Sequence, residues 1–212
     1  LEKILADCVD FDRLKRAPIK LFVTATTVRT GRGRLFRNAD VTPDVLLASA
    51  CLPTLFQAVE IDGEAYWDGG YAGNPSLAPL IRECDSRDTI IVQINPIERP
   101  GTPRTAREIH NRLNEIAFNS ALIKELRAAA LLRKVADPGK GEAAVLFEMR
   151  MHRISTDLMV QLSSSSKMLA EWNFLTMLRD TGRAAASEFL ERHAADLGVR
   201  ATLDIDRYLE GV

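Results

Sequence analysis

The chain has 212 residues, of which 46% are hydrophobic and 27% charged, a composition typical of a globular domain with its own core. Its 28 basic and 29 acidic side chains give a formal net charge of −1, so no overall basic field favours nucleic acid as a partner. The three cysteines lack Cys-x-x-Cys spacing, which argues against a disulfide framework or a zinc site. No apolar run approaches the roughly 18 residues of a membrane span.

The first part of the chain predicts strands around one helix. Residues 19–28 (IKLFVTATTV) are rich in β-branched and aromatic side chains, so we expect a central strand there. A turn at 29–33 leads into a return strand at 34–37. Thr42-Pro43-Asp44 supplies a capping hydroxyl, a proline at the first helical position and an acid in the first turn. This pattern predicts a helix that ends at about Cys51.

Asp68 follows a predicted hairpin of two short strands, 58–61 and 64–67, joined by the favoured turn Asp62-Gly63. Gly69-Gly70 behind it permits positive φ and removes side-chain bulk, so another backbone or a substrate can come close. An aspartate before glycines commonly caps a turn. A carboxylate can also act as a general base when its proton donor is within hydrogen-bond reach. The Asp-Gly-Gly tripeptide by itself favours the capping role.

The second part of the chain predicts longer helices and two strands. Residues 89–95 (TIIVQIN) are apolar almost throughout, as expected of a strand buried on both faces. The predicted elements around it are a helix from Ser76 to about Glu83, a long helix at 104–135 with a core-facing stripe (Ile109, Leu113, Ile116, Ala117, Leu122, Ile123, Leu126), a strand at 144–154, and helices at 155–169 and 173–195. Alternating strands and helices indicate a three-layer α/β fold, and no repeat or linker divides the chain.

The residues of a serine hydrolase with a catalytic histidine are missing from these 212 residues. No Gly-x-Ser-x-Gly pentapeptide and no glycine-rich run for an oxyanion hole are present. The three histidines, His110, His152 and His193, are far apart in the sequence, and none has a partner at metal-ligand spacing. The sequence therefore predicts neither a Ser-His-Asp triad nor a metal site.

Several segments resemble the patatin-like phospholipase family. They are 48–56 (ASACLPTLF), 59–63 (VEIDG), 66–70 (YWDGG) and 73–76 (GNPS), with support from 19–28, 34–38 and 89–96. The resemblance is strongest over 19–96, and residues 105–127 are similar to the bacterial branch of the family. It implies a three-layer α/β/α patatin-like (lysophospholipase-like) fold without its N-terminal strands, in which 104–200 is mainly helical with one late strand.

The resemblance also implies a lipid acyl hydrolase that uses a Ser–Asp dyad. Asp68 would take the proton from the nucleophilic serine and then help water attack the acyl-enzyme, while Gly69 and Gly70 would let the loop lie against the nucleophile turn. The serine and the oxyanion loop are expected upstream of Leu1, so that 1–212 would be the C-terminal portion of a single domain, incomplete for catalysis by itself. Ser49 is not expected to replace that serine, because it lies between alanines inside a predicted helix. A catalytically inactive lipid- or protein-binding module is the alternative.

The partner implied by the resemblance is a lipid or phospholipid ester, and no cofactor or metal is expected. Four arginines cluster around one hairpin (Arg29, Arg32, Arg34 and Arg37), where they would either contact an anionic membrane surface or simply be solvated. A cytoplasmic or peripheral membrane location is favoured. Head-group preference, acyl-chain preference and oligomeric state are not predicted.

Overall fold

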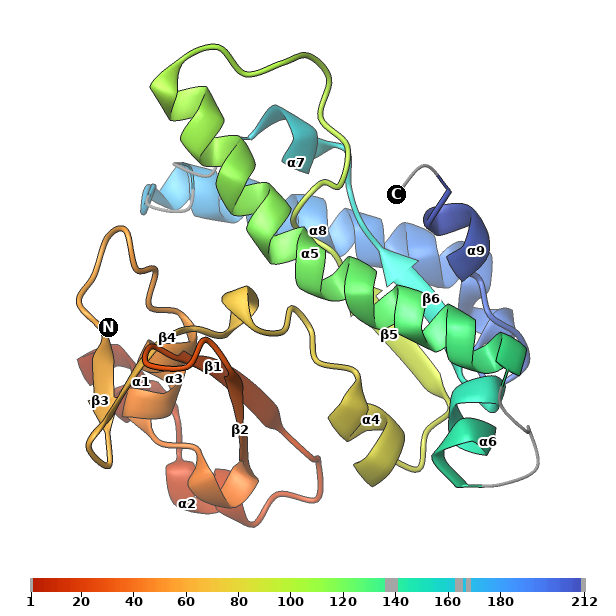
Figure 1. The fold of residues 1–212 in the computed structure, drawn as a ribbon, viewed down its shortest axis with the longest axis horizontal. Coiled ribbons are helices and arrows are strands. Elements are labelled where there is room, and N and C mark those ends of the chain that lie inside the picture. Colours follow the sequence, from red (N-terminus) through yellow and green to blue (C-terminus); the bar gives the residue numbers. More distant parts are fainter. Residues whose placement is uncertain (1, 136–140, 163–165, 167–168, 211–212) are drawn as a thin grey trace. The chain divides into compact units, whose positions relative to one another are not determined.

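The computed structural model describes residues 2–135, 141–162, 166 and 169–210. The chain has an α/β fold and divides into two compact units, unit 1 (Leu1–Leu80) and unit 2 (Ile81–Val212). Figure 1 shows the elements of each unit in chain order. The predicted α/β class is confirmed, whereas the three-layer arrangement over a single domain remains a prediction.

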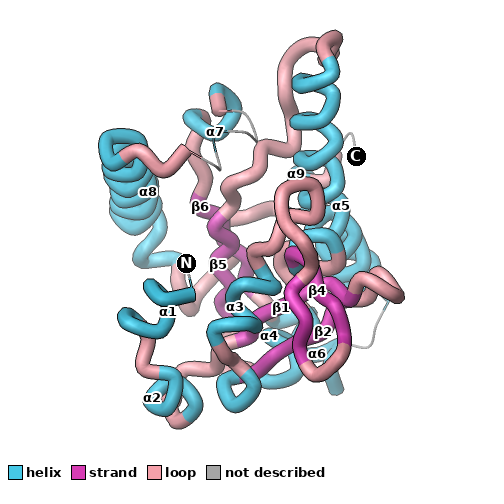
Figure 2. The backbone as a smooth tube through the Cα atoms, turned by 90° about the vertical axis from the view of Figure 1, so that its left-hand side faces the viewer, coloured by secondary structure: helices cyan, strands magenta, loops and turns pink. Residues whose placement is uncertain are grey.

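Unit 1 is built on a four-stranded antiparallel sheet with the order β2-β1-β4-β3. Figure 2 shows its strands β1, β2 and β4. Its elements are α1 (Glu2–Cys8), α2 (Phe11–Lys15), β1 (Phe22–Thr27), β2 (Gly33–Arg37), η1 (Asn38–Asp40), α3 (Pro43–Ser49), β3 (Val59–Ile61), β4 (Glu64–Asp68) and η2 (Gly69–Tyr71). The expected central strand is β1, and the Thr42 hydroxyl caps α3 by accepting a hydrogen bond from the Val45 N–H at 3.3 Å. Because β1 pairs with β2 and β3 pairs with β4, both antiparallel, the two hairpins predicted from the sequence are confirmed.

The core of unit 1 lies between this sheet and α3. Its buried side chains are Ala25, Phe36, Val41, Val45, Ala48 and Tyr66. The Phe36 and Tyr66 rings meet edge to face with centroids 5.9 Å apart. The Arg34 guanidinium lies 4.6 Å from the centre of the Phe36 ring and donates a 2.7 Å hydrogen bond to the Tyr66 hydroxyl. One of the four hairpin arginines thus packs against this core.

Unit 2 contains a parallel strand pair surrounded by helices. The strands are β5 (Asp88–Val92) and β6 (Arg150–Ile154), and their register places Asp88 opposite Arg150. The helices are α5 (Ala106–Val135), α6 (Gly141–Glu148), α7 (Leu158–Gln161), α8 (Trp172–His193), η4 (Ala194–Asp196) and α9 (Ile205–Tyr208), while α4 (Ala78–Glu83) crosses the boundary between the units. None of the described helices is long and apolar enough to span a bilayer.

Three predictions for unit 2 are wrong in detail. Burial alternates along β5, where Ile90 and Val92 are 43% and 68% exposed, so this strand is not buried on both faces. The segment expected to be a strand from 144 begins as α6, and the strand itself starts at Arg150. The buried face of α5 also differs from the expected stripe, since Leu113 is 59% exposed and Glu115 is buried.

Ion pairing explains the burial of Glu115 in α5. The guanidinium groups of Arg99 and Arg112 donate hydrogen bonds to its carboxylate at 2.6 and 3.2 Å. A neighbouring polar residue on the same face, Asn119, donates to the Pro96 carbonyl at 2.8 Å. A buried polar group is tolerated when it is paired, so the buried face of α5 differs from the one that hydrophobicity alone predicts.

Candidate active site

Asp68 is the last residue of β4, and hydrogen bonds on both sides fix its backbone. In the sheet it lies opposite Ala25 of β1. Its N–H donates to the Cys51 carbonyl at 2.8 Å, and its carbonyl accepts a 2.8 Å bond from the Thr26 hydroxyl. The position of this aspartate is therefore set by β1 and by the segment that follows α3.

The side chain of Asp68 caps the turn that follows it. Its Oδ1 accepts a hydrogen bond from the Gly70 N–H at 2.8 Å, at the start of η2. This bond confirms the structural role that the tripeptide alone predicts. An ionised carboxylate has about four acceptor sites on its two oxygens, so one capping bond is compatible with a second, chemical role.

Close packing against β1 explains why glycine follows Asp68. A Cβ built on Gly69 would lie 1.9 Å from the Thr24 carbonyl oxygen, a backbone atom in the middle of β1. Gly69 and Gly70 are buried, and neither is among the described glycines with positive φ. The positive φ that these glycines would permit is therefore not used, whereas the close approach of another backbone is found at Gly69.

Two neighbours of Asp68 are held in their neutral forms. Burial raises the pKa of the Cys51 thiol, and the negative charge of Asp68 raises it further. The same two causes, in the same order, raise the pKa of the Tyr71 phenol. The Cys51 thiol donates to the Gln57 carbonyl at 3.0 Å, as expected of a buried, reduced cysteine.

Ser49 is engaged within its own helix. Its hydroxyl donates to the Leu46 carbonyl in α3 at 2.9 Å, a local bond that is common for helical serines. This bond agrees with the expectation that Ser49 is not the nucleophile.

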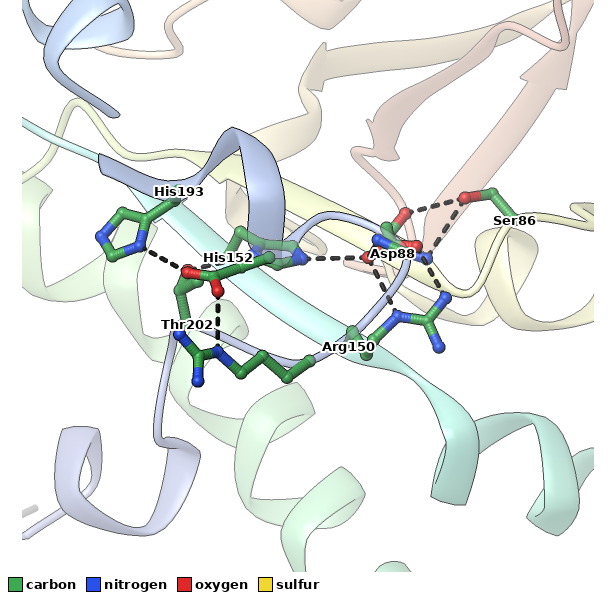
Figure 3. A network of polar contacts seen from close by, with 9 residues as sticks. Ser86, Asp88, Arg150, His152, His193 and Thr202 are labelled. Atoms are coloured by element: carbon green, nitrogen blue, oxygen red, sulfur yellow. Dashed lines mark hydrogen bonds and ion pairs between the residues drawn. The ribbon is translucent and has the colours of Figure 1, made fainter. Parts of the chain in front are cut away.

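The histidines form contacts that sequence spacing did not reveal. Figure 3 shows a polar cluster in unit 2 in which the two ring nitrogens of His152 meet the Thr202 hydroxyl at 2.9 Å and the Asp88 carboxylate at 3.1 Å. Arg150 donates two bonds to Asp88, at 3.0 and 2.7 Å. The Arg150 guanidinium holds the pKa of the Asp88 carboxyl well below its usual range.

We interpret this cluster as structural. His152 is fully buried, and both of its nitrogens have partners. The backbone N–H of Thr202 pairs with the Met151 carbonyl, and the Gly198 N–H donates to Asp88 at 2.9 Å. These contacts tie the segment after α8 to the β5–β6 pair. Because the side-chain contacts of this cluster join residues 50 to 110 positions apart, local sequence spacing could not have predicted it.

The other two histidines have local partners. His193 contacts the Asp196 carboxylate at 2.9 Å, and His110 lies 3.2 Å from the Asn114 amide. Across the described residues, no group of three or more His, Cys, Asp or Glu side chains is arranged to hold a metal ion.

The family model for patatin-like phospholipases matches residues 1–81. The match covers 81 of the 212 residues, and over them the chain is similar to patatin-like phospholipases. The patatin-like match contains the whole β3–β4 hairpin, Asp68 and both glycines, and it ends beside the boundary between the two units. A search of curated proteins found no match to the chain. Similarity to this family suggests, in broad terms, lipid acyl hydrolase activity.

Proposed function

We propose that Asp68 is the general base of a Ser–Asp dyad in a lipid acyl hydrolase, and that residues 1–212 form the C-terminal portion of one patatin-like catalytic domain. The nucleophilic serine and the oxyanion loop would be supplied by sequence upstream of Leu1. The observation that carries the proposal is the placement of Asp68 within the family-matched segment. Its N–H donates to the Cys51 carbonyl, and its carbonyl accepts a hydrogen bond from the Thr26 hydroxyl. A base must be fixed within hydrogen-bond reach of its proton donor, and this aspartate has such a rigid support.

The proposed chemistry has two steps. The serine oxygen attacks the carbonyl carbon of the ester while its proton passes to the Asp68 carboxylate, and the leaving alcohol then takes up that proton. Asp68 next accepts a proton from water as the water oxygen attacks the acyl-enzyme, which releases the fatty acid and restores the serine. Gly69 and Gly70 would let the Asp68 loop lie against the turn that carries the serine. No cofactor takes part in either step.

The proposed substrates are phospholipids or related lipid esters. Contact with an anionic lipid surface is proposed for the hairpin arginines. Arg29 pairs with Glu64 at 2.9 Å, and Arg34 bonds to Tyr66. All four arginines are exposed.

Fluorophosphonate labelling of the full-length gene product tests for the nucleophile and its base. Wild type should label, and Asp68→Asn should label at least about a hundredfold more slowly, in line with the 10²–10⁴ contribution of general bases. The asparagine keeps an oxygen that accepts the Gly70 bond, so the turn should persist. Asp62→Asn is the matched control, because Asp62 is an exposed turn residue of the same hairpin with φ 53°, which asparagine adopts readily.

Wild-type protein that does not label would favour the alternative function, an inactive lipid- or protein-binding module. Equal labelling of wild type and a folded Asp68→Asn variant would instead remove Asp68 from the mechanism.

A further inference from the structure

The side of α5 that points away from the buried residues of unit 2 carries a row of apolar side chains. Ile109, Leu113 and Ile116 are 43%, 59% and 50% exposed, and Leu131 and Val135 extend the row at 62% and 70%. At roughly 100° per residue, all five fall on the side of the helix opposite its buried positions. The first three belong to the stripe that the sequence predicts to face the core, yet they face outward. An apolar row that stays exposed marks an interaction surface.

Cations share this side of α5, and carboxylates do not. Lys124 and Arg127 are exposed and lie between the two parts of the apolar row. The acids of the helix are Glu108, Glu115 and Glu125, and the helical spacing places all three on other sides. We call this surface the α5 exposed face and define it by Ile109, Leu113, Ile116, Lys124, Arg127, Leu131 and Val135.

The acids outside α5 do not cancel this positive charge. An open groove of about 870 Å³ borders the α5 exposed face, and four cations and two carboxylates line it. The carboxylates are Glu98, from the loop before α5, and Glu210, from the segment after α9. Two of the four cations, Arg99 and Arg112, share the buried Glu115. The groove and its ion pairs therefore keep one positive charge in excess.

The charge pattern distinguishes between two occupants of the α5 exposed face. A second copy of the helix would bring Lys124 and Arg127 of both chains into one apolar interface, where like charges repel. An anionic membrane surface attracts the same cations and accepts apolar side chains at the depth of the lipid head groups. The stems of lysine and arginine also bury their methylenes there while the charged ends stay in water. The face therefore complements an anionic bilayer better than it complements itself.

We propose that α5 lies flat on an anionic membrane surface, with Leu113 and its apolar neighbours inserted and with Lys124 and Arg127 at the lipid phosphates. A helix of 30 residues is about 45 Å long and straight enough to bring both parts of the apolar row to one plane. The α5 exposed face is made of unit 2 residues and does not use Asp68. It goes beyond the proposed chemistry, because it would hold the protein at the surface where the proposed substrates are.

Co-sedimentation of the full-length gene product with lipid vesicles tests this surface. The vesicles contain ether-linked phosphatidylcholine alone or with about 30% ether-linked phosphatidylserine, because ether bonds resist the proposed hydrolysis. Wild type should bind the anionic vesicles about thirtyfold more tightly, as expected of two cations near the surface. Raising the salt concentration to about 0.5 M should remove most of this preference. Equal binding to both vesicles, or no binding, would overturn the proposal and leave the face for another occupant, such as an acidic protein.

Leu113→Gln removes one apolar contact from the row. It should weaken binding to the anionic vesicles about tenfold, which is the low end for the burial of one leucine. Leu190→Gln is the matched control, because Leu190 is 50% exposed on α8 and has Glu188 and Glu191 beside it. It should bind like wild type, and a thermal melt shows whether both variants are folded. Equal binding by folded Leu113→Gln and wild type would exclude the α5 exposed face.

The double variant Lys124→Gln with Arg127→Gln removes the two cations of the face. It should weaken binding to the anionic vesicles about thirtyfold and leave binding to the neutral vesicles unchanged. Arg179→Gln with Arg183→Gln is its control, because it removes the same charge from exposed residues of α8. Equal losses in both double variants would show that net charge, and not this face, controls binding.

Membrane binding and the dyad can fail separately. The Lys124→Gln, Arg127→Gln protein should hydrolyse a short-chain ester that is dissolved as monomers at the wild-type rate, and Asp68→Asn should bind vesicles like wild type. If the vesicle results hold while Asp68→Asn hydrolyses normally, the dyad fails and the α5 exposed face stands. If hydrolysis depends on Asp68 but no vesicle is bound, the face fails and the dyad stands.

Discussion

Replacing Gly69 with alanine tests the close approach between the Asp68 loop and β1. The new Cβ would lie 1.9 Å from the Thr24 oxygen and 2.5 Å from the Thr24 carbonyl carbon. The two backbones would have to separate by at least about 1 Å before the contact reaches the 3.0 Å that real Cβ atoms keep. Thr24 cannot move alone, because it is paired with Leu35 of β2 in the sheet.

Overpacking of a core typically costs 1–3 kcal/mol. Here both partners are backbone, so we expect Gly69→Ala to lower the free energy of unfolding by about 3 kcal/mol. In a chain of this size the melting temperature should fall by roughly 6–12 °C. The assay is thermal unfolding followed by circular dichroism, with urea unfolding as a second measurement.

Gly182→Ala is the matched control for this change. It introduces the same methyl group where nothing lies within 4 Å, in the interior of α8. It should raise the free energy of unfolding by about 0.5–1 kcal/mol, because alanine favours the helix. A Gly69→Ala protein as stable as wild type would refute the packing argument and leave the glycine unexplained.

Two further predictions concern hydrogen bonds. The pKa of Asp88 is lowered in the folded protein, mainly by its hydrogen bonds from Arg150. The ionised carboxylate therefore stabilises the folded state fully above about pH 4, and this contribution is lost as the pH falls toward the folded pKa. Asp88→Asn should lower the free energy of unfolding by about 2–3 kcal/mol at pH 7. The urea midpoint of the variant should also fall less than that of wild type between pH 5 and pH 2, and parallel curves of midpoint against pH would contradict this. Thr26→Val removes the bond to the Asp68 carbonyl and should cost about 1 kcal/mol in urea unfolding. Thr24→Val, two residues away on β1, is its control, and equal effects of both would show that the Thr26 bond contributes nothing.

The hairpin that carries Asp68 was predictable because its signals are local. Asp62-Gly63 specifies the turn, and Asp62 indeed has a positive φ of 53°. Asp68 follows at the end of β4 as expected. Which backbone approaches Gly69 was not predictable, since it is that of Thr24, forty-five positions earlier in the chain and brought close only by the sheet.

Unit 2 was harder to predict because its elements depend on contacts distant in sequence. Residues 144–148 (AVLFE) are a short apolar run, which suits a strand or a buried helix equally well, and they form the end of α6. Hydrophobic spacing along α5 could not reveal that Glu115 is buried by two arginines. The Asp88–Arg150 pair follows from the parallel register, which the sequence does not specify.

The ratio of kcat/KM between Asp68→Asn and wild type, measured on a phospholipid ester with the full-length gene product, tests the dyad most directly. We predict a fall of about a thousandfold, within the usual contribution of a general base, with an unchanged melting temperature. Asp62→Asn should retain wild-type kcat/KM. A folded Asp68→Asn enzyme with undiminished kcat/KM would contradict the assignment of Asp68 as the base.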